Sequence, residues 1–97
     1  MQFVQVMECR TSKVDQLTAL EAEWREATEG KRTLRRSILA RDRDEPDRYF
    51  VLAFFDSYES AMENSELTET ASFGAKQAQI LDEPMRFTNL DVIEDKA

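Results

Sequence analysis

Few side chains in this 97-residue sequence are suited to nucleophilic catalysis. The chain has no histidine and a single cysteine, Cys9. A thiol becomes a strong nucleophile when a neighbouring base or positive charge lowers its pKa, and no histidine is present to do this. Cys9 also falls within a stretch that has the pattern of a β-strand. We therefore expect a buried structural thiol, which forms no disulfide within the chain and fits a reducing compartment.

Carboxylates are abundant, but their spacing defines neither a metal site nor an acid–base pair. The chain has 20 acidic and 13 basic residues, which give a formal net charge of −7. The densest acidic group consists of Asp42, Asp44, Glu45 and Asp47, and the arginines beside it compete with any metal for these carboxylates. No spacing among the other acidic residues singles out a pair for acid–base catalysis. We expect no metal.

Arginines are concentrated around the same acidic segment. If two strands form a hairpin here, they gather Arg35, Arg36, Arg41, Arg43 and Arg48. The simpler interpretation is protection of a sheet edge and cross-strand pairing with the nearby aspartates. The alternative is a local basic patch that recognises an anionic ligand or partner.

The overall charge argues against two classes of partner. A chain of net charge −7 is repelled at long range by the phosphates of nucleic acid and by anionic lipid surfaces, so we expect neither nucleic acid nor membrane as a partner. No apolar stretch approaches the ~20 residues of a membrane span, and the first residues lack the pattern of a signal peptide. The cytoplasm is the expected location.

Alternating apolar residues predict four strands. They cover Phe3 to Cys9, Leu34 to Arg41, Tyr49 to Phe55 and Met85 to Ile93. The first and third carry large apolar residues on both sides, which indicates strands covered on two faces. The arginine-rich second strand has the composition of a sheet edge. In the fourth, the apolar positions change phase, which predicts a bulge or a change of neighbour.

The first predicted helix follows the first strand. Ser12 is the expected N-cap, and Leu17 and Trp24 belong to an apolar stripe that ends at Gly30. The stripe makes Trp24 a core residue in the simpler interpretation. The other side of the helix is strongly charged, and we expect it to face solvent; it contains Glu21, Glu23, Arg25, Glu26 and Glu29.

A second helical region follows the third strand. Asp56 or Ser57 can cap a short helix, and a bend near Asn64 and Ser65 leads into a longer one from about Leu67 to Leu81. Ser65 is the expected cap of the longer helix. Small residues along it predict close packing on the sheet; they are Ala71, Gly74 and Ala78.

The order of elements predicts a single α+β domain over residues 1–97. A ferredoxin-like β-α-β-β-α-β chain forms a four-stranded antiparallel sheet of strand order 4-1-3-2 with both helical regions on one face. The first and third strands then lie in the centre, as their two apolar sides require. The uncovered face, on which we expect Val6 and Val51, is an apolar patch that isolated soluble domains avoid. We therefore predict a homodimer in which a second copy of the sheet covers this face.

Nearly the whole chain resembles the dimeric α+β barrel superfamily, and in particular its antibiotic-biosynthesis-monooxygenase-type (ABM) domains. The resemblance lies in the opening strand Phe3-Val4-Gln5-Val6, the helix to Trp24, and the run from Tyr49 through Asp56-Ser57-Tyr58-Glu59-Ser60-Ala61. It implies a dimeric barrel with a pocket between helices and sheet in each subunit. It also implies oxidation of phenolic or anthrone-like small aromatic molecules by molecular oxygen without a cofactor, since such substrates supply their own electrons.

The resemblance also suggests residues for the site. Asn64 and Arg86 match the polar pair of the family and are the candidate catalytic residues. The candidate substrate-binding walls are Trp24, Phe50, Tyr58 and Phe73.

Two positions depart from the family pattern. The monooxygenases carry a Trp four residues after the Asn and a Tyr further along, where this chain has Thr68 and, close to the second position, Ser72 and Phe73. Haem-degrading relatives need an axial histidine, which is absent here. Two functions remain open. One is a cofactor-independent monooxygenase of aromatic or quinol-like molecules, and the other is a non-catalytic ligand-binding or structural dimeric module.

Overall fold

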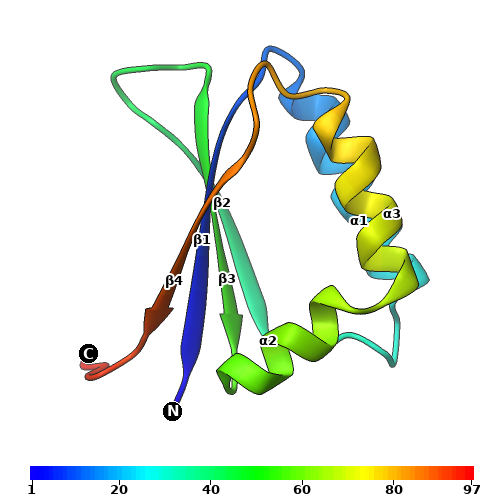
Figure 1. The fold of residues 1–97 in the computed structure, drawn as a ribbon. Coiled ribbons are helices and arrows are strands. Elements are labelled where there is room, and N and C mark those ends of the chain that lie inside the picture. The colour runs from blue at the N-terminus through cyan, green and yellow to red at the C-terminus, as the bar shows by residue number, and fades with distance from the viewer.

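The computed structural model describes all residues 1–97 and contains the predicted order of strands and helices (Figure 1). The elements are β1 (Phe3–Arg10), α1 (Val14–Ala27), β2 (Arg36–Arg41), β3 (Arg48–Phe55), α2 (Tyr58–Ser65), α3 (Thr68–Ala78) and β4 (Arg86–Asp91). The predicted ferredoxin-like α+β fold is confirmed. The bend predicted near Asn64 is the break between α2 and α3.

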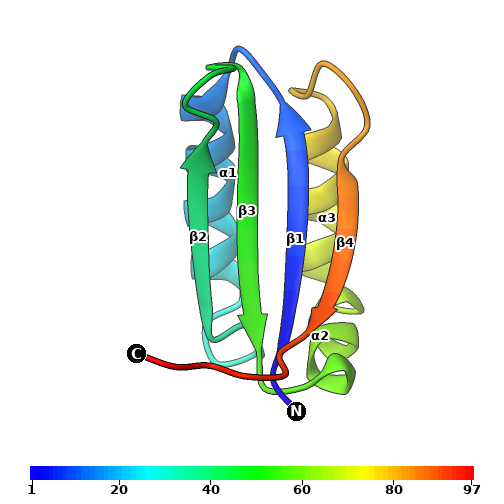
Figure 2. The ribbon, with the colours of Figure 1, turned by 90° about the vertical axis from the view of Figure 1, so that its left-hand side faces the viewer.

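The strands form one antiparallel sheet of order β2-β3-β1-β4, as predicted (Figure 2). The two-sided apolar strands β1 and β3 are its centre. The bulge or change of neighbour predicted in the fourth strand is wrong, because β4 pairs with β1 residue by residue from Phe3 opposite Asp91 to Glu8 opposite Arg86. All six residues of β4 are exposed, so this edge strand has no face on which apolar residues are required.

All three helices lie on the same side of the sheet, and the other side carries none (Figure 1). Beneath the helices, the buried core is formed by alternate residues of β1 and β3 together with α1 and α2. One cluster contains Phe3, Ala53, Phe55 and Ala61, and a second contains Cys9, Leu17 and Tyr49. Cys9 is 1% exposed, so the expected burial of this thiol is confirmed. Burial raises its pKa, and the nearby Glu8 carboxylate adds to the effect.

The uncovered face of the sheet is formed by the alternate residues between those of the core. Val6 lies opposite Leu52, whereas Val51 lies opposite Met7 on the helical side. The expectation that Val51 faces the open side is therefore wrong, and Leu52 occupies that position. The exposed surface of the chain is 6607 Å², against about 5,700 Å² for a compact monomer of this mass.

Of the predicted helix caps, Ser57 is confirmed. Its hydroxyl accepts a hydrogen bond from the N–H of Ser60, and the Ser60 hydroxyl accepts one from the N–H of Ser57, so the pair forms a capping box. This device fixes the point at which the chain leaves β3 and enters α2.

The caps predicted at Ser12 and Ser65 are wrong. Lys13 is the N-cap of α1, and the hydroxyl that accepts its N–H belongs to Thr11. At α3 the N-cap is Leu67, which makes no side-chain cap.

The packing predicted for α3 is also wrong. Ala71, Gly74 and Ala78 are exposed, and a Cβ added to Gly74 meets no atom within 4 Å. Phe73 faces inward instead, and its ring packs against that of Trp24 with centroids 6.0 Å apart. Thus α3 packs on α1 rather than directly on the sheet, which leaves space between the two layers. None of the three helices is both long enough and apolar enough to cross a membrane.

Candidate functional site

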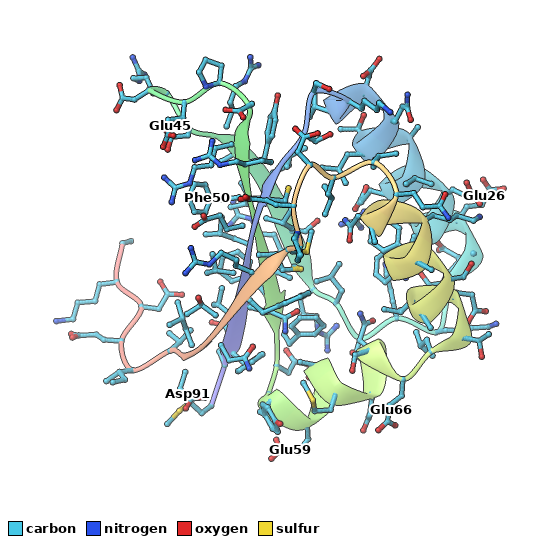
Figure 3. The ribbon with its side chains drawn as sticks, turned by 45° about the horizontal axis from the view of Figure 1, so that its top comes forward. Glu26, Glu45, Phe50, Glu59, Glu66 and Asp91 are labelled. Atoms are coloured by element: carbon cyan, nitrogen blue, oxygen red, sulfur yellow. The ribbon has the colours of Figure 1, made fainter.

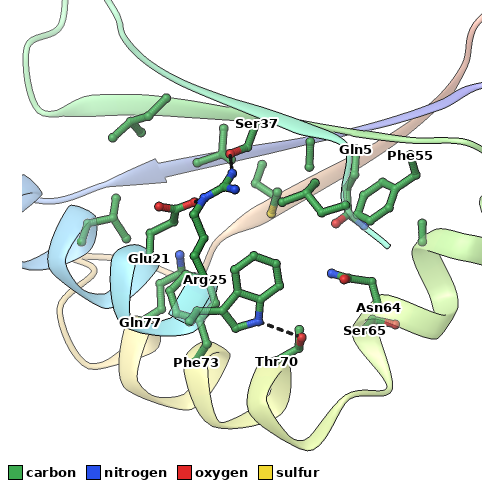
Figure 4. A pocket seen from close by; sticks show the side chains of 18 of the residues that line it. Gln5, Glu21, Arg25, Ser37, Phe55, Asn64, Ser65, Thr70, Phe73 and Gln77 are labelled. Carbon is green, nitrogen blue, oxygen red and sulfur yellow. Dashed lines mark hydrogen bonds and ion pairs between the residues drawn. The ribbon is translucent and has the colours of Figure 1, made fainter. Parts of the chain in front are cut away.

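A cavity of about 380 Å³ lies between the helices and the sheet (Figure 4). This volume falls within the range of about 300–1,000 Å³ that is usual for small-molecule sites. All elements except β4 contribute to its walls. The ten hydrophobic lining residues are Met7, Leu17, Trp24, Leu34, Leu39, Val51, Ala53, Phe55, Ala61 and Phe73. An apolar molecule of moderate size therefore fits between the layers.

Asn64 brings an uncommitted hydrogen-bond donor to this cavity. The residue is 7% exposed, and its Oδ1 accepts the backbone N–H of Thr33 at 3.1 Å. That bond fixes which end of the amide is the oxygen, so Nδ2 is the end that points into the cavity (Figure 4). Nδ2 donates to no protein group. This donor is accessible from the cavity, so a ligand or a water there can accept its hydrogen bond.

The surroundings of Asn64 hold it in this orientation. The Thr33 hydroxyl donates a hydrogen bond to the carbonyl of Ser60, so the connection between α1 and β2 is attached to α2 at two points. The capping box anchors the start of the same helix. The donor is thus positioned before any ligand arrives, which reduces the entropy lost on binding.

Trp24 and Phe73 both line the cavity and form an aromatic wall there. Trp24 is 6% exposed, and its indole Nε1 donates to the hydroxyl of Thr70 at 3.0 Å (Figure 4). Because its N–H is satisfied within the protein, Trp24 offers a ligand its ring face rather than a hydrogen bond.

A charged pair, Glu21 and Arg25, lies at the other side of the cavity from Asn64 (Figure 4). Arg25 donates from Nε to Glu21 Oε1 at 2.5 Å and from Nη2 to the Ser37 hydroxyl at 2.8 Å. The expectation that both charged residues face solvent is wrong. Their positions could have been inferred, because Glu21 and Arg25 follow the buried Leu17 in steps of four and so share its side of the helix.

Arg86 does not join Asn64. It lies opposite Glu8, whose side chain points to the face of the sheet away from the cavity, and it is exposed. The predicted pair of Asn64 and Arg86 is therefore not assembled within one chain. The only arginine that lines the cavity is Arg25.

Two of the predicted aromatic walls lie elsewhere. Phe50 is opposite Glu8 on the uncovered face, where the guanidinium of Arg48 lies 4.8 Å from its ring centroid (Figure 3). Tyr58 is 48% exposed at the start of α2 and makes an edge contact with Phe3 outside the cavity. The expectation that these two rings line the cavity is wrong.

Of the positions that depart from the family pattern, Phe73 lines the cavity, whereas Thr68 and Ser72 lie outside it. Thr68 and Ser72 line a separate depression between α1 and α3. Neither replaces the missing Trp or Tyr as a cavity group. The cavity of this chain therefore has its own set of polar residues.

The charged hairpin between β2 and β3 pairs with itself and with the neighbouring strand β1. Arg48 contacts Glu8 at 3.0 Å and Asp42 at 3.1 Å, and Arg10 contacts Glu45 and Asp47. The hydrogen bond from Arg48 is the main reason that the pKa of Glu8 is lowered. No group of three or more His, Cys, Asp or Glu side chains is arranged to hold a metal ion. Of the five arginines predicted to pair here, Arg48 forms the expected cross-strand contacts, and Arg35 pairs with Asp56 just after β3.

Comparison with known proteins identifies the fold. No protein-family model matches the sequence, and no curated protein matches it. Several solved structures do match over nearly the whole chain. SnoaB, a cofactor-independent oxygenase from Streptomyces nogalater solved as an asparagine-to-alanine mutant, has a TM-score of 0.81 at 9% identity, covering 97% of this chain and 95% of its own.

Two further structures give the same result. An antibiotic biosynthesis monooxygenase has a TM-score of 0.74 at 12% identity, covering 97% of this chain and 100% of its own. Rv0793 from Mycobacterium tuberculosis has a TM-score of 0.80 at 14% identity, with both chains fully covered. At these identities the likeness establishes the fold, which is the ABM-type α+β fold inferred from the sequence.

Proposed function

We propose that this protein binds a planar hydroxylated aromatic molecule in the cavity and oxidises it with molecular oxygen, without a cofactor. The observation that carries the proposal is the free Nδ2 of Asn64, a fixed donor inside an apolar, aromatic-walled cavity. The ABM-type fold, which this chain shares with a cofactor-independent oxygenase, supports the reaction class.

The substrate supplies the electrons in this chemistry. When the ring methylene of an anthrone loses a proton, the resulting enolate or phenolate is oxidised by O₂; the CH₂ carbon becomes a carbonyl with one oxygen atom, and the other leaves as water with both hydrogens. In a hydroquinone, one oxygen atom converts a ring C–H to C–OH, the hydroquinone becomes a quinone, and the other oxygen atom leaves as water with the two hydroxyl hydrogens. The protein has to orient the ring, exclude water and stabilise the negative charge on the substrate oxygen. Asn64 is placed to donate a hydrogen bond to that oxygen, and one such donor contributes about 10²–10³ in rate.

The working form is a homodimer. The uncovered face of the sheet presents Val6, Leu52 and Leu90, and Leu90 is 46% exposed. A second copy seated on this face removes these side chains from water. Because the cavity lies on the opposite face, each subunit keeps its own.

Oxygen uptake tests the reaction. A panel of anthrones and hydroquinones is supplied to the wild type, to Asn64→Ala and to Gln16→Ala, whose amide is exposed on α1 outside the cavity. We expect uptake with at least one substrate, a loss of about a hundredfold in Asn64→Ala, and no change in Gln16→Ala. Equal rates in the wild type and Asn64→Ala remove Asn64 from the mechanism.

A non-catalytic binding module is the second candidate. The observation that favours it is the small number of polar groups available to a substrate. Thr68 and Ser72 lie outside the cavity, and the Trp24 N–H is already bonded to Thr70. Quenching of Trp24 fluorescence by an aromatic ligand, without oxygen uptake across the panel, selects this alternative.

A further inference from the structure

The cavity has a second polar end whose residues are not used by the proposed reaction. Glu21 and Arg25 on α1 lie across the cavity from Asn64 on α2 (Figure 4). Each end is held by the same stretch of chain, since Asn64 is bonded to Thr33 and Arg25 to Ser37. A ligand that fills the cavity therefore meets a polar group at each end.

The pair keeps unused hydrogen-bonding capacity. A guanidinium has five N–H donors, of which Arg25 uses one for Glu21 and one for Ser37. Its Nη1 bonds to no protein group, and the same is true of Glu21 Oε2. The two side chains are about 37% and 39% exposed, so neither is enclosed by protein. This end thus offers unused donors on Arg25 and an unused acceptor on Glu21.

We propose that Arg25 and Glu21 determine specificity by binding a second hydroxyl of the aromatic ligand, at the end opposite the oxygen that Asn64 contacts. The inference rests on the proposed function for the nature of the ligand, and it adds the residues that select it.

A hydroxyl suits this end because it can use either kind of group. It can accept a hydrogen bond from Arg25 or donate its own proton to Glu21. A carboxylate on the ligand can only accept, and it meets the negative charge of Glu21. A ring edge without a polar group leaves both unused positions without a partner, and hydrogen bonds to charged groups are among the stronger ones.

Binding is measured without oxygen, so that turnover plays no part. Trp24 is the only tryptophan and lines the cavity, which makes its fluorescence a direct probe of occupancy. The probes are naphthohydroquinone, naphthol and hydroxynaphthoate, which share a ring system and differ in the second polar group. The variants are Arg25→Gln and Glu21→Gln, and the control is Glu26→Gln, an exposed residue of the same helix outside the cavity (Figure 3).

We expect the wild type and Glu26→Gln to bind naphthohydroquinone at least tenfold more tightly than naphthol. In Arg25→Gln and Glu21→Gln this preference disappears while the affinity for naphthol is unchanged. Glu21→Gln keeps the shape of the side chain, so it reports on the pair even if Arg25→Gln does not fold.

Four results overturn the inference. The first is that no probe quenches the fluorescence of Trp24, and the second is that the wild type does not prefer naphthohydroquinone to naphthol. The third is that hydroxynaphthoate binds more tightly than naphthohydroquinone, and the fourth is that Arg25→Gln and Glu21→Gln lose affinity for naphthohydroquinone and naphthol equally. Failure of the proposed function is separate: a preference that depends on Arg25 and Glu21, in a protein that consumes no oxygen, supports this inference and removes the oxidation.

Discussion

The substitution Leu52→Asp should separate the proposed dimer into subunits. Leu52 lies at the centre of the uncovered sheet face, opposite Val6 on β1 and Ile38 on β2. The exposed surface of the single chain, 6607 Å², exceeds the value for a compact monomer of this mass by roughly 900 Å². That excess is close to the ~800 Å² that each partner buries in a standard interface.

The expected size of the effect follows from symmetry. A two-fold interface contains the substituted position twice, so the dimer of the variant buries two carboxylates without partners. Each costs several kcal/mol even after local relaxation, and every 1.4 kcal/mol is about a factor of ten in the dissociation constant. A total of about 5 kcal/mol or more weakens association by over a thousandfold.

Sedimentation at micromolar concentration measures the result. The wild type should sediment at twice 11.3 kDa and Leu52→Asp at 11.3 kDa or as unfolded chain. The matched control is Ala71→Asp, which places the same carboxylate on the exposed side of α3 and should stay dimeric. A wild type that is monomeric and soluble at this concentration refutes the argument, as does a Leu52→Asp dimer of unchanged affinity.

Three further predictions concern stability and reactivity. Asn64→Ala leaves the partly buried N–H of Thr33 without its acceptor, so the free energy of unfolding should fall by about 1–3 kcal/mol and the melting temperature by about 5–15 °C, as calorimetry can measure. The fold lowers the pKa of Asp42, mainly through the N–H of Asp44, and lowers that of Glu8 through Arg48; the ordinary values are 3.8 and 4.5. Such carboxyls bind fewer protons folded than unfolded, so their stabilisation is present above these ordinary values and is lost as the pH falls through the folded pKa; acid unfolding should be less steep in Asp42→Asn. Burial of Cys9 raises its pKa, so a thiol reagent should modify it only at the rate at which denaturant opens the fold, and rapid modification of the native protein would contradict this.

The arrangement of the sheet could be predicted because β1 and β3 are apolar on both sides. Only a central strand needs two apolar faces, so composition and topology agree on the strand order. The same property hides which side faces the helices. A strand with polar residues on one side shows its buried face by alternation. Val51 and Leu52 are both apolar, so the sequence does not show which of them faces the helices. The choice is made by the helices, which cover the side on which Val51 lies.

The cavity residues were predicted least well, for a related reason. Sequence patterns locate the stripe of a helix that packs against a neighbour, and they assume that the neighbour is the sheet. Here α3 packs on α1 and stands away from the strands, so the small residues near Gly74 have nothing to approach. Glu21 and Arg25 carry charges that on most helices mark the solvent side, yet here that side borders a cavity. Asn64 was identified from the family resemblance and Trp24 partly from its apolar stripe.

The alternation of side chains along the central strands also separates the two proposed sites, the dimer interface and the ligand site. Along β3, one set of residues lines the cavity and the set between them forms the uncovered face, so a dimer interface and a ligand site share one strand without sharing a side chain. On the cavity side, the short stretch from Thr33 to Ser37 holds both polar ends, because Thr33 fixes Asn64 and Ser37 fixes Arg25. Since Ser37 is in β2 and paired with Ala53 of the central strand, the sheet itself sets the spacing between the donor at one end and the charged pair at the other. The distance between the two polar ends is therefore set by the rigid part of the fold. The length of a ligand, more than its ring area, decides whether it can hydrogen-bond to Asn64 and to the Glu21–Arg25 pair at the same time.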